Sequence, residues 1–249
     1  MTVDQFHLSG AWNFRDVGGL KADDGRTIRP GILFRSSELC ALDADGQRTL
    51  LGLGVADVVD LRSPDEVAYN RPDALPSGVH LHSTPVKDHE RQEHAPHEQP
   101  RVLTPELAEV LLEYAYTRFP VLENGQKALA HTIELIANST GGVLIHCAAG
   151  KDRAGWIVAA VLRAAGISES DILADYLRSN DGIEPLRQVV IARNGDLTQI
   201  SDKVLGVHED FLHGAWRAVD EKYGSFENYL ELIGVRDESV ERLRARLLG

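Results

Sequence analysis

Short apolar runs alternate with segments of helical periodicity through the first two thirds of the chain. Runs rich in Val, Ile and Leu predict strands, at residues 31–35, 57–61, 79–83 and 142–146. Residues 43–53 predict a helix that has Asp43 as its N-cap and ends near Gly54. Such alternation is typical of an α/β fold with a largely parallel sheet. No repeat or Pro-, Gly- or Ser-rich linker divides the pattern, so we expect a single domain over 1–249.

After Gly166 the pattern becomes almost entirely helical. Apolar residues recur at helical spacing in five segments, 172–178, 185–192, 209–222, 226–233 and 238–248. We therefore expect a helical cap beside the sheet. Residues 87–101 behave differently, because they have no apolar period and contain three histidines. They predict a mobile surface insertion.

Composition and charge restrict the partners. The net charge is -12, from 38 acidic and 26 basic residues, which disfavours binding to nucleic acid or to an anionic membrane. A phosphate-bearing substrate would need a local cationic pocket. No stretch approaches the roughly 20 apolar residues of a membrane-spanning helix, and the N-terminus lacks the features of a classical signal peptide. With only two cysteines, we expect a reduced, cytoplasmic protein; non-classical export would leave no mark in the sequence.

One segment carries a recognisable chemistry. The predicted strand that ends at His146 is followed by Cys147 and by three small residues. Residues 151–153, Lys-Asp-Arg, come next, and a predicted helix then runs from Trp156 and stops at Gly166. The small residues are Ala148, Ala149 and Gly150. A strand, a small-residue loop and a helix N-terminus together form a nest of backbone N–H groups that binds anions. The absence of bulky side chains lets a phosphate approach the backbone, so we expect these residues to bind substrate.

The side chains around this loop suggest roles in phosphoryl transfer. The donors that favour phosphate also favour a thiolate, so Cys147 is the expected nucleophile. The planar guanidinium of Arg153 matches two phosphate oxygens. Lys151 is expected to be a second phosphate-facing cation, with a flexible ammonium at the outer edge of the loop. His146 is expected to orient the loop through a hydrogen bond to the backbone.

Three other interpretations of these residues are weaker. A lone cysteine after a buried strand is usually a core residue, but it is not usually followed by this loop and arginine. A nucleotide P-loop would need glycine at Ile145 and Ser or Thr at Asp152. A metal site would need regular ligand spacing, and the histidines lack it, at His80, His82, His89, His94 and His97. We therefore expect no metal and no cofactor.

The segment His-Cys-x5-Arg resembles the signature loop of the protein tyrosine phosphatase superfamily. The full loop, HCAAGKDR, is similar to the bacterial family typified by mycobacterial protein tyrosine phosphatase B. Further similar blocks lie at residues 13–16, 33–39, 60–63 and 174–181. The resemblance implies hydrolysis of phosphotyrosine, of other phosphoamino acids in some members and of phosphoinositides, through a phosphocysteine and with an oxyanion in the loop.

The resemblance also implies a fold and further roles. It implies a tyrosine-phosphatase-like fold, a parallel-centred sheet flanked by helices, with a C-terminal helical lid at about 181–210 and a flap at 87–101. Asp152 would be the general acid, with Asp88 in the flap as the alternative. Asp60 and Arg62 end a predicted strand where α/β ligand sites lie, so they either buttress the loop or form a surface ion pair.

One position departs from the signature. Most members of the family that it resembles carry Thr or Ser after the arginine, where the hydroxyl normally hydrogen-bonds the departing sulfur, but this chain has Ala154. We expect slower breakdown of the phosphoenzyme. The departure leaves open a phosphate-binding adaptor that has lost catalysis. An arsenate reductase would need resolving cysteines, and only Cys40 is available; we expect Cys40 to be a buried, inert thiol.

Overall fold

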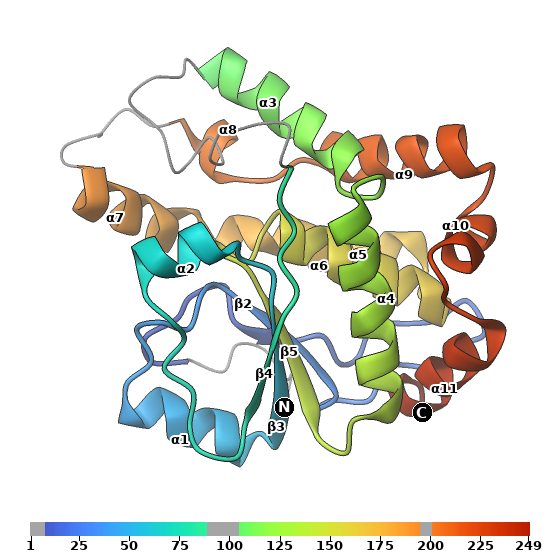
Figure 1. The fold of residues 1–249 in the computed structure, drawn as a ribbon, viewed down its shortest axis with the longest axis horizontal. Coiled ribbons are helices and arrows are strands. Elements are labelled where there is room, and N and C mark those ends of the chain that lie inside the picture. The colour runs from blue at the N-terminus through green and yellow to red at the C-terminus, as the bar shows by residue number, and fades with distance from the viewer. Residues whose placement is uncertain (1–7, 89–104, 195–200) are drawn as a thin grey trace.

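The computed structural model describes residues 8–88, 105–194 and 201–249 (Figure 1). Within them the sheet has the strand order β1-β2-β5-β3-β4, and every neighbouring pair is parallel except the antiparallel β1 and β2. The strands are β1 (Arg15–Asp16), β2 (Leu33–Ser36), β3 (Val55–Asp60), β4 (His80–Ser83) and β5 (Gly142–His146). The predicted α/β fold with a parallel-centred sheet is confirmed.

The central strand β5 separates two apolar layers. Val143 and Ile145 face the larger core, whereas Leu144 faces the smaller one, as the alternation of side chains along a strand requires. The larger core includes residues of α4 (Glu123–Asn138) and α5 (Arg153–Ala165), and the smaller one includes residues of α1 (Ala44–Gly52). Helices therefore cover both faces of the sheet, which explains why β5 reads as a continuous apolar run.

The chain after Gly166 is helical, as the pattern predicts. Its elements are α6 (Glu169–Leu177), the 3₁₀ helix η2 (Arg178–Gly182), α7 (Ile183–Asn194), α8 (Asp202–Leu205), α9 (Glu209–Tyr223), α10 (Phe226–Leu232) and α11 (Asp237–Leu247). Helix α9 packs against α3 (Pro105–Arg118), and α11 packs against α4. Figure 1 shows α7, α8 and α3 above the carboxyl ends of the strands. These elements surround the end of β5.

The N-terminal helix prediction is also accurate. The Asp43 carboxylate accepts hydrogen bonds from the backbone N–H groups of Asp45 and Gly46, so α1 begins where its cap predicts. The 87–101 insertion lies outside the described residues apart from Lys87 and Asp88. Helices α2 (Pro64–Asn70), α3 and α4 were not predicted. Among the described residues, none of the helices combines the length and the apolar character needed to cross a bilayer.

Candidate active site

The predicted phosphate loop lies at the carboxyl end of the central strand. Cys147 directly follows β5 and is 2% exposed, and α5 begins at Arg153. Parallel strands on both sides, β2 and β3, end beside it. In open α/β sheets ligands bind outside the carboxyl ends of the strands, at the point where the strand order reverses.

Hydrogen bonds hold the loop carbonyls away from its interior. The oxygen of Ala148 accepts from the backbone N–H of Glu38 at 3.1 Å, and that of Ala149 accepts from Asn13 Nδ2 at 3.1 Å. The oxygen of Gly150 accepts from Arg35 Nη2 at 2.8 Å. Within the described part of the chain, every hydrogen bond to the main chain of residues 148–151 goes to a carbonyl. Loops in which successive backbone N–H groups are left to point inward are the kind that can bind an anion.

Gly150 is required by the backbone of the loop. Its φ is +70°, and a Cβ at this position would lie 2.2 Å from the carbonyl oxygen of Ser36. A side chain would therefore clash with β2 as well as strain the main chain.

A buried charge cluster supports the loop from below. Asp175 in α6 accepts from Arg15 Nε at 2.7 Å and from Arg35 Nη1 at 2.8 Å. Burial raises the pKa of Asp175, but the two guanidinium groups outweigh it and hold that pKa below its usual value. Asp175 thus fixes the Arg35 side chain that binds Gly150, and it links three of the sequence blocks that resemble relatives.

Glu66 positions the guanidinium of Arg153. Arg153 Nη1 and Nη2 donate to the two carboxylate oxygens of Glu66 at 2.7 and 2.6 Å. Glu66 also accepts from the backbone N–H of Ser63, so a capping box at the start of α2 orients the carboxylate. Burial raises the pKa of Glu66, yet Arg153 and Ser63 lower it to about 2 overall. Glu66 was missed in the sequence, although the Ser63-x-x-Glu66 pattern was visible.

Replacing Glu66 with Gln should lower the free energy of unfolding at neutral pH but not in acid. The pKa of Glu66 falls from 4.5 to about 2 on folding, so its stabilisation is present above pH 4.5 and is lost as the pH falls toward 2. That shift is worth about 3 kcal/mol at neutral pH. Urea unfolding from pH 7 to pH 2 should show wild type converging on Glu66→Gln in acid. Curves that stay parallel would contradict this role.

Asp60 and Arg62 form a buried pair, not a surface one. Arg62 is 0% exposed and donates to Asp60 at 2.9 Å and to Asp73 at 2.8 Å, with Glu38 at 3.3 Å. His146 lies behind them, with Nδ1 3.3 Å from the Cys147 carbonyl oxygen and Nε2 3.0 Å from Asp73 Oδ2. Burial lowers the pKa of His146, but the two aspartates raise it overall.

This cluster also has the composition of a metal site. Ligand atoms of Asp60, Asp73 and His146 lie within 4.8 Å of one another. Arg62 already supplies the positive charge between the two carboxylates. A divalent cation would therefore compete with a buried guanidinium, so the geometry favours structural support of the loop.

The expected placement of Lys151 is wrong. Its ammonium does not lie at the outer edge of the loop: Lys151 is 1% exposed and donates to the Gly206 carbonyl at 3.0 Å and to Asp152 at 3.2 Å. Gly206 directly follows α8, so Lys151 connects the loop to the segment packed over it. Ala149 of the loop packs in an apolar cluster with Leu186 and Val190 of α7 and Leu205 of α8.

A chain of buried hydroxyl groups holds Asp152. Tyr176 in α6 donates to the Tyr116 hydroxyl at 2.7 Å, and Tyr116 in α3 donates to Asp152 Oδ1 at 3.1 Å. Burial is the main reason that the pKa of each tyrosine is raised, so both are neutral donors. The alternative acid, Asp88, pairs with Arg118 at 2.9 Å. Tyr176 lies in the 174–181 block that resembles relatives, but no sequence pattern predicted its contact with Tyr116, because their helices meet only in the fold.

With Asp152 as the general acid that the family resemblance implies, Tyr116→Phe should impair its proton transfer. The variant loses one hydrogen bond to a carboxylate, which corresponds to about a tenfold fall in kcat for substrates with poor leaving groups. Tyr176→Phe is the matched control, since it removes a hydroxyl one step further from Asp152 and should cost less than about threefold. Steady-state kinetics with an alkyl and an activated aryl phosphate measure both. Equal losses on the two substrates would assign Tyr116 to folding instead.

Comparison with known proteins identifies the family of the chain. Residues 6–249 match a model described as the tyrosine phosphatase family, so the chain belongs to that family. The chain is 40% identical to the triple specificity protein phosphatase PtpB of Mycobacterium tuberculosis, over 97% of this chain and 98% of that one. It is 27% identical to a tyrosine-protein phosphatase of Nostoc commune, over 86% and 73% of the two chains.

Proposed function

We propose that this chain hydrolyses phosphate monoesters through a phosphocysteine on Cys147. The observation that carries the proposal is the loop between β5 and α5: its carbonyls are tied outward, Cys147 stands at its start and Glu66 orients Arg153 at its end. The helix N-terminus and Arg153 stabilise charge on the transferring phosphoryl group. The chain therefore contains a candidate nucleophile, Cys147, a candidate anion site in the loop with Arg153, and a candidate acid, Asp152.

The chemistry divides into two balanced steps. The Cys147 thiolate attacks phosphorus while the bond to the leaving oxygen breaks, and Asp152 gives that oxygen its proton. Water then attacks the phosphocysteine and gives a proton to Asp152, while the sulfur–phosphorus bond breaks to release phosphate and the thiolate. Neither step needs a metal ion, because Arg153 and the backbone N–H groups supply the positive charge.

The proposed substrates are phosphotyrosine, phosphoserine or phosphothreonine, and phosphoinositides. The name of the Mycobacterium tuberculosis relative assigns it three specificities. Because the Lys151 ammonium is buried, it is not available to bind a second phosphate of the substrate. We propose instead that Lys151 positions the carboxylate of Asp152. Helices α7 and α8, packed on Ala149, are the proposed lid of a single phosphatase domain.

One panel tests the proposed function. An activated aryl phosphate, phosphotyrosine and phosphoserine peptides and short-chain phosphoinositides should be hydrolysed, with inhibition by vanadate and no effect of EDTA. Short-chain lipid is needed, because the net charge of -12 opposes adsorption to an anionic bilayer. Phosphate binding without turnover would identify an adaptor. Thiol-dependent reduction of arsenate would identify a reductase, which Cys40 would have to support.

Restoring a hydroxyl next to Arg153 should speed the second step. Ala154 is fully buried in the main core. Its methyl side chain has no hydroxyl that could stabilise the departing thiolate. Wild type should show a burst of released alcohol, and Ala154→Thr should raise the rate after the burst. Stopped-flow kinetics measure both. If wild type shows no burst and the variant no gain, another group has taken this role.

A further inference from the structure

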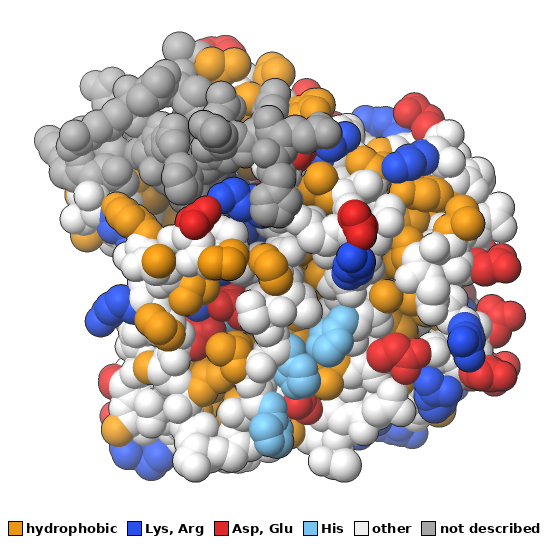
Figure 2. Space-filling view, in the orientation of Figure 1, with side chains coloured by type: hydrophobic (Ala, Val, Ile, Leu, Met, Phe, Trp, Pro, Cys, Tyr) orange, Lys and Arg blue, Asp and Glu red, His pale blue; other side chains and the backbone are white. Residues whose placement is uncertain are grey.

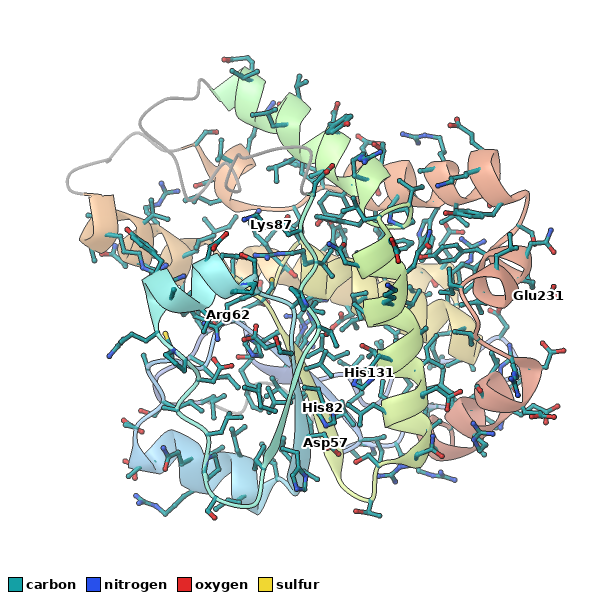
Figure 3. All side chains as sticks on the ribbon, viewed as in Figure 1. Asp57, Arg62, His82, Lys87, His131 and Glu231 are labelled. Carbon is teal, nitrogen blue, oxygen red and sulfur yellow. The ribbon has the colours of Figure 1, made fainter. Side chains whose placement is uncertain are left out.

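A histidine pair lies at the outer edge of the sheet, on a different part of the molecule. Figure 2 shows histidine side chains gathered on one face, and Figure 3 places His82 and His131 next to Asp57. The three residues come from β4, α4 and β3. Asp57 pairs in register with Val143, four residues before Cys147, so the pair lies roughly 13 Å along the strands from the phosphate loop.

Asp57 sets the orientation of the His82 ring. Asp57 Oδ1 lies 2.9 Å from His82 Nε2, and Asp57 Oδ2 accepts from Ser139 Oγ at 2.6 Å. With both oxygens engaged, the carboxylate holds the tautomer of His82 that carries its proton on Nε2. The lone pair of His82 is then on Nδ1, which faces His131. A carboxylate behind the distal nitrogen is the arrangement that supports histidine ligands in metal sites.

The separation of the two rings fits a shared ion. His82 Nδ1 and His131 Nε2 are 3.3 Å apart, which is long for a hydrogen bond between nitrogen atoms. Two nitrogen ligands of a tetrahedral zinc ion, each bonded at about 2.0–2.1 Å, lie about 3.3–3.4 Å apart. The exposed His131 ring can turn slightly to point its lone pair at the same ion.

We propose that His82 and His131 bind a borderline transition-metal ion such as Zn²⁺ or Ni²⁺, with Asp57 behind His82 and water in the remaining positions. Imidazole is the preferred ligand of these ions. The bound ion would link the edge strand β4 to α4. Because residues 84–86 connect β4 to Lys87 and Asp88, the ion would also brace this stretch of chain without entering the phosphate loop. Sequence spacing hid the site, since His131 lies 49 residues after His82.

Calorimetric titration with Zn²⁺ or Ni²⁺ alone tests the proposal. The full chain should carry Cys147→Ser, because a thiolate in the phosphate loop is a competing zinc ligand. This parent should bind one ion, and binding should raise its Tm by several degrees. His82→Gln and His131→Gln should each weaken binding more than about tenfold, and Asp57→Asn by about 10–100-fold. His213→Gln is the matched control. This half-exposed histidine pairs with Glu169 and is not part of the group formed by His82, His131 and Asp57.

A spectroscopic measurement separates ligation from a general loss of structure. Co²⁺ bound to the parent should give visible absorption bands that disappear in His131→Gln, whose exposed helical position tolerates the change without unfolding. Unchanged metal affinity in the double variant His82→Gln and His131→Gln would overturn the proposal, as would no binding to the parent at millimolar metal. Phosphatase activity does not enter this test, so its outcome is independent of the proposed function.

Discussion

Cys147→Ser is expected to lower kcat by about a thousandfold or more on every phosphate ester. A serine hydroxyl is a far weaker nucleophile than a thiolate, because it stays protonated at neutral pH. The binding of inorganic phosphate should stay within about tenfold of wild type. The reason is that the carbonyl ties to Asn13 and Arg35, and the Arg153–Glu66 pair, do not involve the sulfur.

Two measurements on this variant have to agree. Rapid denaturing quench of wild type with a ³²P-labelled aryl phosphate should trap label on the protein, and Cys147→Ser should trap none. Cys40→Ser is the matched control, because Cys40 is the other free cysteine and burial raises the pKa of its thiol. Turnover by Cys147→Ser within tenfold of wild type would overturn covalent catalysis. So would a loss of labelling in Cys40→Ser alone.

Asp152→Asn is expected to have the next largest effect, and one that depends on the leaving group. An alkyl oxygen must be protonated as it departs, so turnover of a phosphoserine peptide should fall by about 10²–10⁴-fold. A nitrophenolate needs little protonation, so its phosphate ester should lose less than about tenfold. Asparagine keeps the shape of the side chain and can still accept the hydrogen bond from the Tyr116 hydroxyl. The variant therefore tests the loss of the acidic proton alone.

Asp88→Asn provides the comparison. Its ion pair with Arg118 anchors the start of the insertion to α3, so the variant should affect KM more than the dependence on leaving group. A plot of log kcat against leaving-group pKa should steepen for Asp152→Asn and stay parallel to wild type for Asp88→Asn. The reverse pattern would make Asp88 the acid and leave Asp152 as a partner of Lys151.

The sequence alone was sufficient to predict the central strand and the loop that follows it. The strand Gly142–His146 was predicted with its observed bounds, because an apolar run between a Gly-Gly turn and a small-residue loop permits few alternatives. The helices after Gly166 were recognisable from their apolar period. The loop from Cys147 to Arg153 is one short stretch of chain, so the residues proposed for nucleophile, anion nest and arginine could be named from the sequence alone.

Only the tertiary structure decided what supports that loop. Glu66 reaches Arg153 from 87 residues away, and Tyr116 reaches Asp152 from 36 residues away. Lys151 looked like a mobile surface cation but is buried beneath Gly206, because α8 returns over the loop. Periodicity shows which face of an element is apolar, but it does not show which elements meet. A buried polar group takes its partner from whichever element the packing brings near, and that depends on the whole fold.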